Sequence, residues 1–241
     1  MNMMIVEYPQ YGIYNKAGVL PSAKNILEDA YHLMQFITRI MKISQENIIL
    51  MGRSIGTGPV VEMASIFKPA CLLLVSPFTS IKDIATDQLG YCAGLLIRQR
   101  FNNLELIKSN KIQCPILFIH GQRDQLVPVT QSQILYKNYK GHCSMILPTQ
   151  MTHNEFDFTD DFIMPIYMFL LSIGQIDTNQ QKLTGWSQRE FNILQVIQEV
   201  PKWLKQLNDK KGQRRQRICY CLCKARGGGN IFQSLIRKLL F

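Results

Sequence analysis

The chain has 241 residues, of which 46% are apolar and 18% charged, and its formal net charge is +10. These values fit one globular domain, alone or with a tail, and they exclude a fully disordered chain, a collagen and a coiled coil. The longest apolar stretch, residues 162–174, contains Pro165 and is too short to cross a bilayer. The first residues do not resemble a secretory signal, so we expect a cytosolic chain.

The excess positive charge lies at the C-terminal end of the chain. Residues 1–200 hold 16 basic and 16 acidic residues, whereas residues 201–241 hold 11 basic residues and only Asp209. A neutral body with a basic end argues against a nucleic-acid-binding domain and favours a globular core with an electrostatic tether. The seven cysteines are odd in number and unevenly spaced, which makes a disulfide framework a poor interpretation.

Short apolar runs alternate with longer amphipathic ones through the first 170 residues. We predict buried strands at residues 3–8, 47–51, 71–75, 115–120 and 143–147. Helical patterns occur at residues 22–42, 57–67, 130–138 and 160–171, the first with Ser22 as a candidate N-cap. This alternation predicts an α/β fold with a parallel sheet covered by helices on both faces.

Two segments depart from the alternation. Residues 79–112 form a mostly helical insertion that could cover a site, and after about residue 175 the sequence becomes polar and glutamine-rich, with a further helical pattern at 187–208. We therefore predict a globular domain over residues 1–175. Residues 176–241 would supply a polar linker, a helix and a basic, cysteine-containing tail.

A candidate nucleophile follows the second predicted strand. Ser54 is the centre of a Gly-x-Ser-x-Gly sequence, residues 52–56, that leads directly into a helical pattern. In that context the motif predicts a sharp turn that presents the serine hydroxyl at a helix N-terminus. An ordinary glycine-rich turn between strand and helix is the alternative.

A serine nucleophile requires a histidine base that a carboxylate orients. Asp124 follows the strand at 115–120 and His153 follows the strand at 143–147, which gives the chain order Ser, Asp, His that α/β hydrolases use. His120 closes a strand and favours a structural role. Taken singly, Asp124 could be a turn residue and His153 a surface loop residue; together with Ser54 they predict a catalytic triad.

Five stretches of the sequence resemble the Bem46-like α/β hydrolases, and most of all the α/β-hydrolase-domain depalmitoylases, which remove palmitate from membrane-attached proteins. These stretches are residues 7–12, 46–57, 76–78, 115–124 and 153–154. The resemblance implies that Ser54 is the nucleophile, Asp124 the orienting acid and His153 the general base. A mechanism with these three residues needs no metal or organic cofactor.

The resemblance also marks two departures from the family pattern. The family's sequence begins earlier, with a His-Gly loop that lends one N–H to the oxyanion hole and with the strand beside the nucleophile strand. We expect the Ile55 N–H to remain as a donor and the sheet to have a gap, in a fragment of a longer product or in a degenerate relative. The family's lipid-modified cysteines are N-terminal, whereas the cysteine cluster here is C-terminal.

The tail combines arginines with three thiols. Arg214, Arg215 and Arg217 precede Cys219, Cys221 and Cys223, the pattern that S-palmitoylation at an anionic membrane requires. Apolar residues at 231–240 share one face and predict a short interfacial helix. A zinc site is poorly supported by these cysteines alone, and a disordered basic tail or a gene-prediction artefact is the alternative.

These features predict a serine hydrolase that cleaves thioesters of acylated proteins, held by its tail at the cytosolic face of the plasma membrane or endosomes. The partners would be an acylated protein and an anionic membrane surface. A general carboxylesterase or lipase, a peptidase of similar fold, and a catalytically impaired fragment that acts as a membrane-tethered interaction module are the alternatives.

Overall fold

The computed structural model describes residues 3–11, 14 and 21–176. The predicted helix at 187–208, the cluster Cys219, Cys221 and Cys223, and the interfacial helix at 231–240 lie outside the described residues. The division into a domain at 1–175 and a tail at 176–241 therefore stays a prediction.

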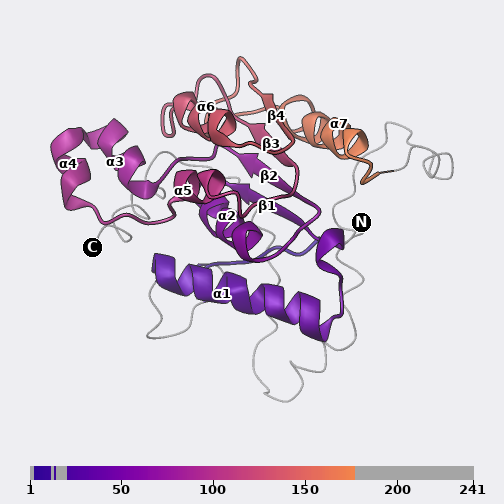
Figure 1. The fold of residues 1–241 in the computed structure, drawn as a ribbon. Coiled ribbons are helices and arrows are strands. Elements are labelled where there is room, and N and C mark those ends of the chain that lie inside the picture. The colour runs from indigo at the N-terminus through magenta and orange to yellow at the C-terminus, as the bar shows by residue number, and fades with distance from the viewer. Residues whose placement is uncertain (1–2, 12–13, 15–20, 177–241) are drawn as a thin grey trace, which may run out of the picture.

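A four-stranded parallel sheet forms the centre of the molecule (Figure 1). Its strands follow one another in space as they do along the chain: β1 (Ile49–Arg53), β2 (Cys71–Val75), β3 (Ile116–Ile119) and β4 (Cys143–Ile146). In the register, Met51 lies opposite Leu73, and Leu73 lies opposite Leu117. The predicted α/β class and four of the five predicted strands are confirmed, with ends displaced by up to two residues.

Helices connect the strands and cover the sheet. Their bounds are α1 (Ala23–Gln35), α2 (Thr57–Ile66), α3 (Ile81–Leu89), α4 (Tyr91–Leu96), α5 (Asn103–Lys108), α6 (Val129–Asn138) and α7 (Met164–Ser172). The Ser22 hydroxyl accepts a hydrogen bond from the Asn25 N–H at 3.1 Å, so the predicted N-cap of α1 is confirmed. A π-helical turn, Phe36–Ile40, extends α1. The insertion is helical as predicted and contains α3, α4 and α5.

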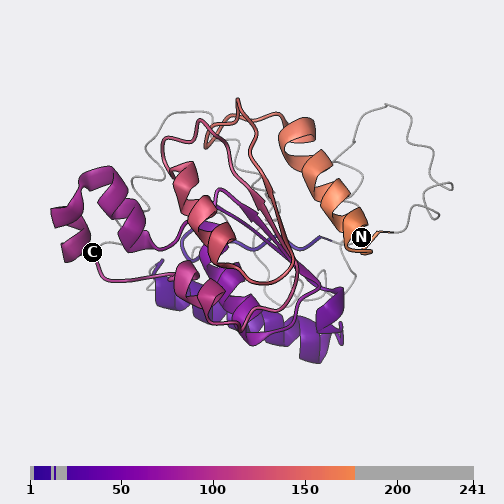
Figure 2. The ribbon, with the colours of Figure 1, turned by 45° about the horizontal axis from the view of Figure 1, so that its top comes forward.

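The two faces of the sheet bury alternate residues of the same strands. On one face Leu72 and Leu74 pack in a cluster with Val61 of α2 and Leu135 of α6. On the other face Leu73 and Val75 are clustered with side chains of α7, and Figure 2 shows α7 on the side of the sheet away from α2 and α5. Because β2 has helices on both sides, all five of its residues are buried.

The predicted strand at residues 3–8 is wrong. This segment joins no strand, and four consecutive apolar side chains in it are at least 45% exposed: Met3, Met4, Ile5 and Val6. An extended apolar run becomes a strand only when a neighbouring backbone pairs with it, and within the described residues β1 pairs only with β2. Tyr8, at the end of the run, does pack on the cluster that contains Ile26.

None of the helices within residues 3–11, 14 and 21–176 has the length and hydropathy needed to span a bilayer.

Candidate active site

Ser54 occupies a sharp turn between β1 and α2. The strand ends at Arg53, residues Ser54–Gly56 form one 3-10 turn, and α2 begins at Thr57. Ser54 has a φ of 52°, in the left-handed region that non-glycine residues rarely adopt. A Cβ at Gly52 would lie 2.4 Å from the carbonyl oxygen of Gly56, so the turn closes only with glycine there. This is the strand-turn-helix context that the motif predicts.

His153 is held against Ser54 by the loop that follows β4. Its Nε2 lies 3.0 Å from the Ser54 Oγ. The loop is a tight turn, in which the Thr152 N–H donates to the Glu155 carbonyl at 2.8 Å and the Glu155 N–H donates to the Thr152 hydroxyl at 2.9 Å. The His153 side chain is only 7% exposed, which keeps the imidazole at one position beside the serine.

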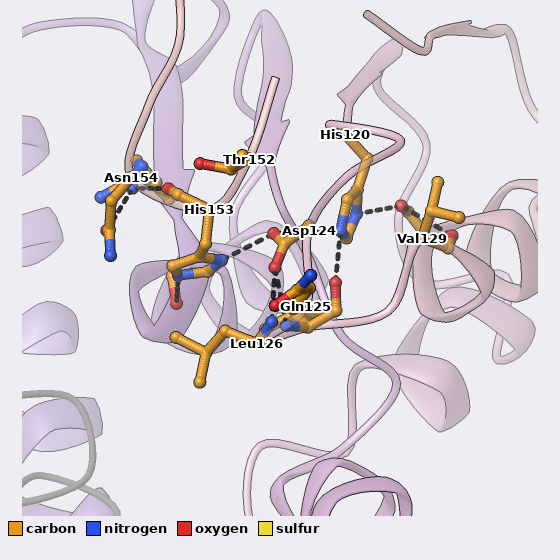
Figure 3. Close-up of polar contacts among 12 residues, drawn as sticks. His120, Asp124, Gln125, Leu126, Val129, Thr152, His153 and Asn154 are labelled. Carbon is orange, nitrogen blue, oxygen red and sulfur yellow. Dashed lines mark hydrogen bonds and ion pairs between the residues drawn. The ribbon is translucent and has the colours of Figure 1, made fainter. Parts of the chain in front are cut away.

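Asp124 completes the chain of contacts from the loop after β3. Its Oδ2 lies 2.6 Å from the Nδ1 of His153, and its Oδ1 accepts hydrogen bonds from the N–H groups of Leu126 at 2.9 Å and Val127 at 2.8 Å (Figure 3). Because a carboxylate only accepts, Nδ1 carries the hydrogen and Nε2 is left to accept the Ser54 proton. Asp124 is therefore both a turn residue and the partner of His153.

The environment of Asp124 favours its ionised form. Burial alone would raise the pKa of this carboxyl. Hydrogen bonds from His120 and His153, the charge of His153 and the Val127 N–H outweigh burial and hold the pKa of Asp124 well below its ordinary value. The carboxylate thus stays charged in the interior, where it can stabilise an imidazolium at His153.

His120 lies on the opposite side of the Asp124 carboxylate from His153 (Figure 3). The imidazole is fully buried, with Nε2 at 2.8 Å from the Val127 carbonyl oxygen and 3.4 Å from Asp124 Oδ2, while Nδ1 is hydrogen-bonded to the Ser132 hydroxyl. These contacts give His120 the structural role that the sequence predicts. The contact of His120 with Asp124 was not predicted from the sequence, because the two residues lie in an irregular turn, where a spacing of four indicates no contact.

Arg53 connects the nucleophile turn to the His153 loop. Its Nη2 donates to the carbonyl oxygen of His153 and, at 3.2 Å, to the Oδ1 of Asn154. The guanidinium carbon also lies 5.6 Å from the centroid of the Phe156 ring. The role of Arg53 was not predicted either, because Arg53 is a variable position of the motif and nothing in a single sequence indicates its partner.

Two other groups lie at the turn. Ile55, the expected oxyanion-hole residue, directly follows Ser54 in the 3-10 turn, so its backbone N–H belongs to the same turn as the serine. The Tyr8 hydroxyl lies 3.3 Å from the position that a Cβ at Gly56 would occupy, and burial raises the pKa of Tyr8 to about 12. A phenol with that pKa remains a hydrogen-bond donor at neutral pH.

In the part of the chain that the structure describes, no group of three or more His, Cys, Asp or Glu side chains lies close enough together to hold a metal ion. The arrangement formed by Ser54, His153 and Asp124 is instead one that activates a hydroxyl for attack on an acyl carbon.

Comparisons with known proteins identify the family of this chain. The family model described as "Serine hydrolase (FSH1)" matches residues 34–154, half of the chain, a range that contains Ser54, Asp124 and His153. The chain is 27% identical to mouse alpha/beta hydrolase domain-containing protein 17C over 171 residues, which are 70% of this chain and 50% of that protein. It is 26% identical to human alpha/beta hydrolase domain-containing protein 17B over 172 residues, which are 70% of this chain and 57% of that protein. The chain thus spans about half the length of the curated relatives it matches.

A solved structure supports the fold. The structure of Est1E from Butyrivibrio proteoclasticus superposes with a TM-score of 0.52 at 18% identity, covering 64% of this chain and 72% of that one. The matched family range contains the strained serine turn and the two loops that meet it. The chain therefore belongs to the FSH1 serine hydrolase family and has an α/β hydrolase fold.

Proposed function

We propose that this chain cleaves acyl esters and thioesters with Ser54 as nucleophile, His153 as general base and Asp124 as orienting acid. One observation carries the proposal: contacts of 3.0 Å and 2.6 Å join the three side chains in an unbroken order, starting from a serine with a φ of 52°. Three residues brought from separate strand ends to these distances are the geometry that nucleophilic catalysis by serine requires.

The reaction would proceed in two stages. Ser54 Oγ attacks the thioester carbonyl carbon while His153 Nε2 takes its proton, and the Ile55 N–H stabilises the oxyanion that forms. The C–S bond then breaks, and His153 returns the proton to the leaving thiolate. In the second stage His153 deprotonates a water that attacks the acyl-enzyme, which releases the fatty acid and restores Ser54. Neither stage requires a cofactor.

The substrate class we favour is a palmitoylated protein. The support is the resemblance of the Ser54 turn and of the Asp124 and His153 loops to the depalmitoylases. The insertion at 79–112 would lie over the acyl chain, since the Gln88 side chain of α3 donates to the carbonyls of Gln125 and Leu126, which directly follow Asp124.

We also propose that the basic tail attaches the protein to the cytosolic face of the plasma membrane or endosomes. Its 11 basic residues at 201–241 would bind anionic lipid, and acylation at Cys219, Cys221 or Cys223 would supply the second anchor that stable attachment needs. Changing these three cysteines to Ser should move the protein from the membrane to the soluble fraction. Unchanged sedimentation would remove the lipidated tail from the proposal.

A fluorophosphonate probe tests the nucleophile. We expect the probe to label the wild-type chain and to spare Ser54→Ala. Ser76→Ala is the matched control, because Ser76 also follows a strand, has a positive φ of 47° and is fully buried, but its hydroxyl has no hydrogen-bond partner among the described residues. Labelling of Ser54→Ala at the wild-type rate would refute the assignment. A folded wild type that is not labelled would favour an interaction module.

The acyl group is tested with matched substrates. We expect faster release from a palmitoyl-thioester peptide than from an acetyl ester or an acylamino peptide. Faster cleavage of the acetyl ester would favour a general carboxylesterase, and faster cleavage of the acylamino peptide a peptidase-like specificity. Either result would leave the Ser54 assignment in place.

A further inference from the structure

The helices α3 and α4 form a pair that projects from one end of the molecule (Figures 1 and 2). α3 is anchored inward by Ile81 and Ile84, which are each 1% exposed. α4 packs on α3 through Gly94, where a Cβ would lie 2.0 Å from the Thr86 hydroxyl oxygen. Gly94 is therefore the residue of α4 that faces α3.

The outward side of this helix pair is apolar. Leu89 is 62% exposed, Tyr91 72%, Leu95 59% and Leu96 88%. We call these four residues the apolar tip. A surface helix of a globular protein normally buries its leucines, whereas α4 exposes both of its leucines and its tyrosine. An exposed apolar cluster on a projecting element indicates a surface that contacts a membrane or another molecule.

The charged residues that follow the apolar tip in the chain are positive. The acidic residues of α3 precede the tip: Asp83 accepts from the Ser80 hydroxyl at 2.7 Å, and Asp87, which is exposed, accepts from the Gln131 amide at 2.6 Å. Between residues 88 and 100 the charged residues are Arg98 and Arg100, of which Arg98 is exposed and Arg100 partly exposed. An apolar cluster flanked by arginines complements an anionic lipid surface, where apolar groups enter the interface and cations bind phosphate.

We propose that the apolar tip inserts into the interfacial layer of an anionic bilayer, with Arg98 and Arg100 on the headgroups. The shape of the surface favours a bilayer, because a projecting end offers no groove for a peptide and a helix has no free backbone edge for an added strand. Gln88 connects the same element to the loop of Asp124, through hydrogen bonds of 2.9 and 3.1 Å to the carbonyls of Gln125 and Leu126. Docking through the tip would therefore hold the Ser54 site near the membrane surface, in addition to the attachment that the tail provides.

Hydrogen exchange measured by mass spectrometry on the full chain tests this contact. We would use the Ser54→Ala variant, so that the result does not depend on hydrolysis, and vesicles of phosphatidylcholine with 30% phosphatidylserine. Added vesicles should slow exchange in residues 88–97. Leu95→Asp/Leu96→Asp should abolish that protection and weaken vesicle partitioning by about tenfold or more. Ile40→Asp is the matched control: Ile40 is 69% exposed and lies at the end of the α1 extension.

Three outcomes would overturn the proposal. Exchange in residues 88–97 could stay unchanged while the chain is vesicle-bound, or the double variant could partition like Ile40→Asp. Protection of the same residues that rises with protein concentration without vesicles would assign the tip to a second copy of the chain. The variants should keep the wild-type melting temperature because both leucines are exposed. If the double variant unfolds, the exchange measurement on the Ser54→Ala chain, in which both leucines are kept, tests the proposal.

Discussion

Replacing Arg53 with Met tests whether the guanidinium holds the His153 loop against the nucleophile turn. Met retains much of the apolar stem and removes the donors to the His153 carbonyl and the Asn154 side chain, as well as the contact with the Phe156 ring. A hydrogen bond from a charged group contributes about 1.5–3 kcal/mol and an exposed cation–π contact about 0.5–1 kcal/mol. Because Arg53 is partly exposed and these contacts are not additive, we expect the free energy of unfolding to fall by about 2–3 kcal/mol.

The expected effect on chemistry is larger than that on stability. His153 Nε2 lies 3.0 Å from Ser54 Oγ, and a displacement of about 1 Å in such a contact costs roughly 100-fold in rate. Arg53→Met should therefore react with a fluorophosphonate about 10- to 100-fold more slowly than the wild type, at a temperature where both are folded. Labelling should not be abolished, because Asp124 still orients the imidazole.

Arg123→Met is the matched control for charge. Arg123 is exposed and directly precedes Asp124, so its loss removes one positive charge near the site without removing the contacts of Arg53. We expect a change of less than about twofold in labelling and no shift in melting temperature. The reasoning is refuted if folded Arg53→Met is labelled at the wild-type rate, or if Arg123→Met slows labelling equally.

The other predictions concern the buried carboxylate, the turn glycine and the cysteines. Because the folded pKa of Asp124 is lowered, its ionised form stabilises the fold above about pH 4, and this contribution is lost as the pH falls towards the folded pKa. In denaturant unfolding, Asp124→Asn should therefore reduce the loss of unfolding free energy between about pH 4 and lower pH; an unchanged loss would contradict the lowered pKa. Gly52→Ala should cost roughly 2–4 kcal/mol and abolish labelling, since its Cβ would meet the Gly56 carbonyl at 2.4 Å; a wild-type melting temperature would show that the turn can relax. Iodoacetamide at about pH 8 should modify exposed Cys92 and spare Cys71, whose pKa burial raises to about 12, and equal modification of the folded chain would count against that burial.

The fold was predictable where local pattern and burial agree. The strand at 71–75 is apolar at every position, and the structure buries all five residues between two layers of helices. Residues 3–8 carry a similar apolar run, but a strand also needs a paired neighbour, and that requirement is absent from the pattern itself. Apolar composition predicts what a segment could bury, whereas pairing depends on which backbone lies beside it.

The candidate site was predictable from chain order, and its supporting contacts were not. Ser54, Asp124 and His153 each follow a strand, so a parallel sheet brings them to the same edge. The contact of Arg53 with the His153 loop joins positions 100 residues apart, and no spacing rule indicates it. The burial of His120 against Asp124 depends on Ser132 of α6, and thus on how that helix packs.

Asp124 shows how closely the fold and the candidate chemistry depend on each other. One carboxylate oxygen closes the turn through the Leu126 and Val127 N–H groups, and the other faces His153. On its far side His120 extends the contacts to Ser132 of α6, so one series of polar contacts runs from that helix to Ser54 in the turn before α2. A substitution anywhere in this series changes both the position of the imidazole and the folding stability. Labelling rates of such variants therefore bear on the mechanism only when each is measured below its own unfolding transition.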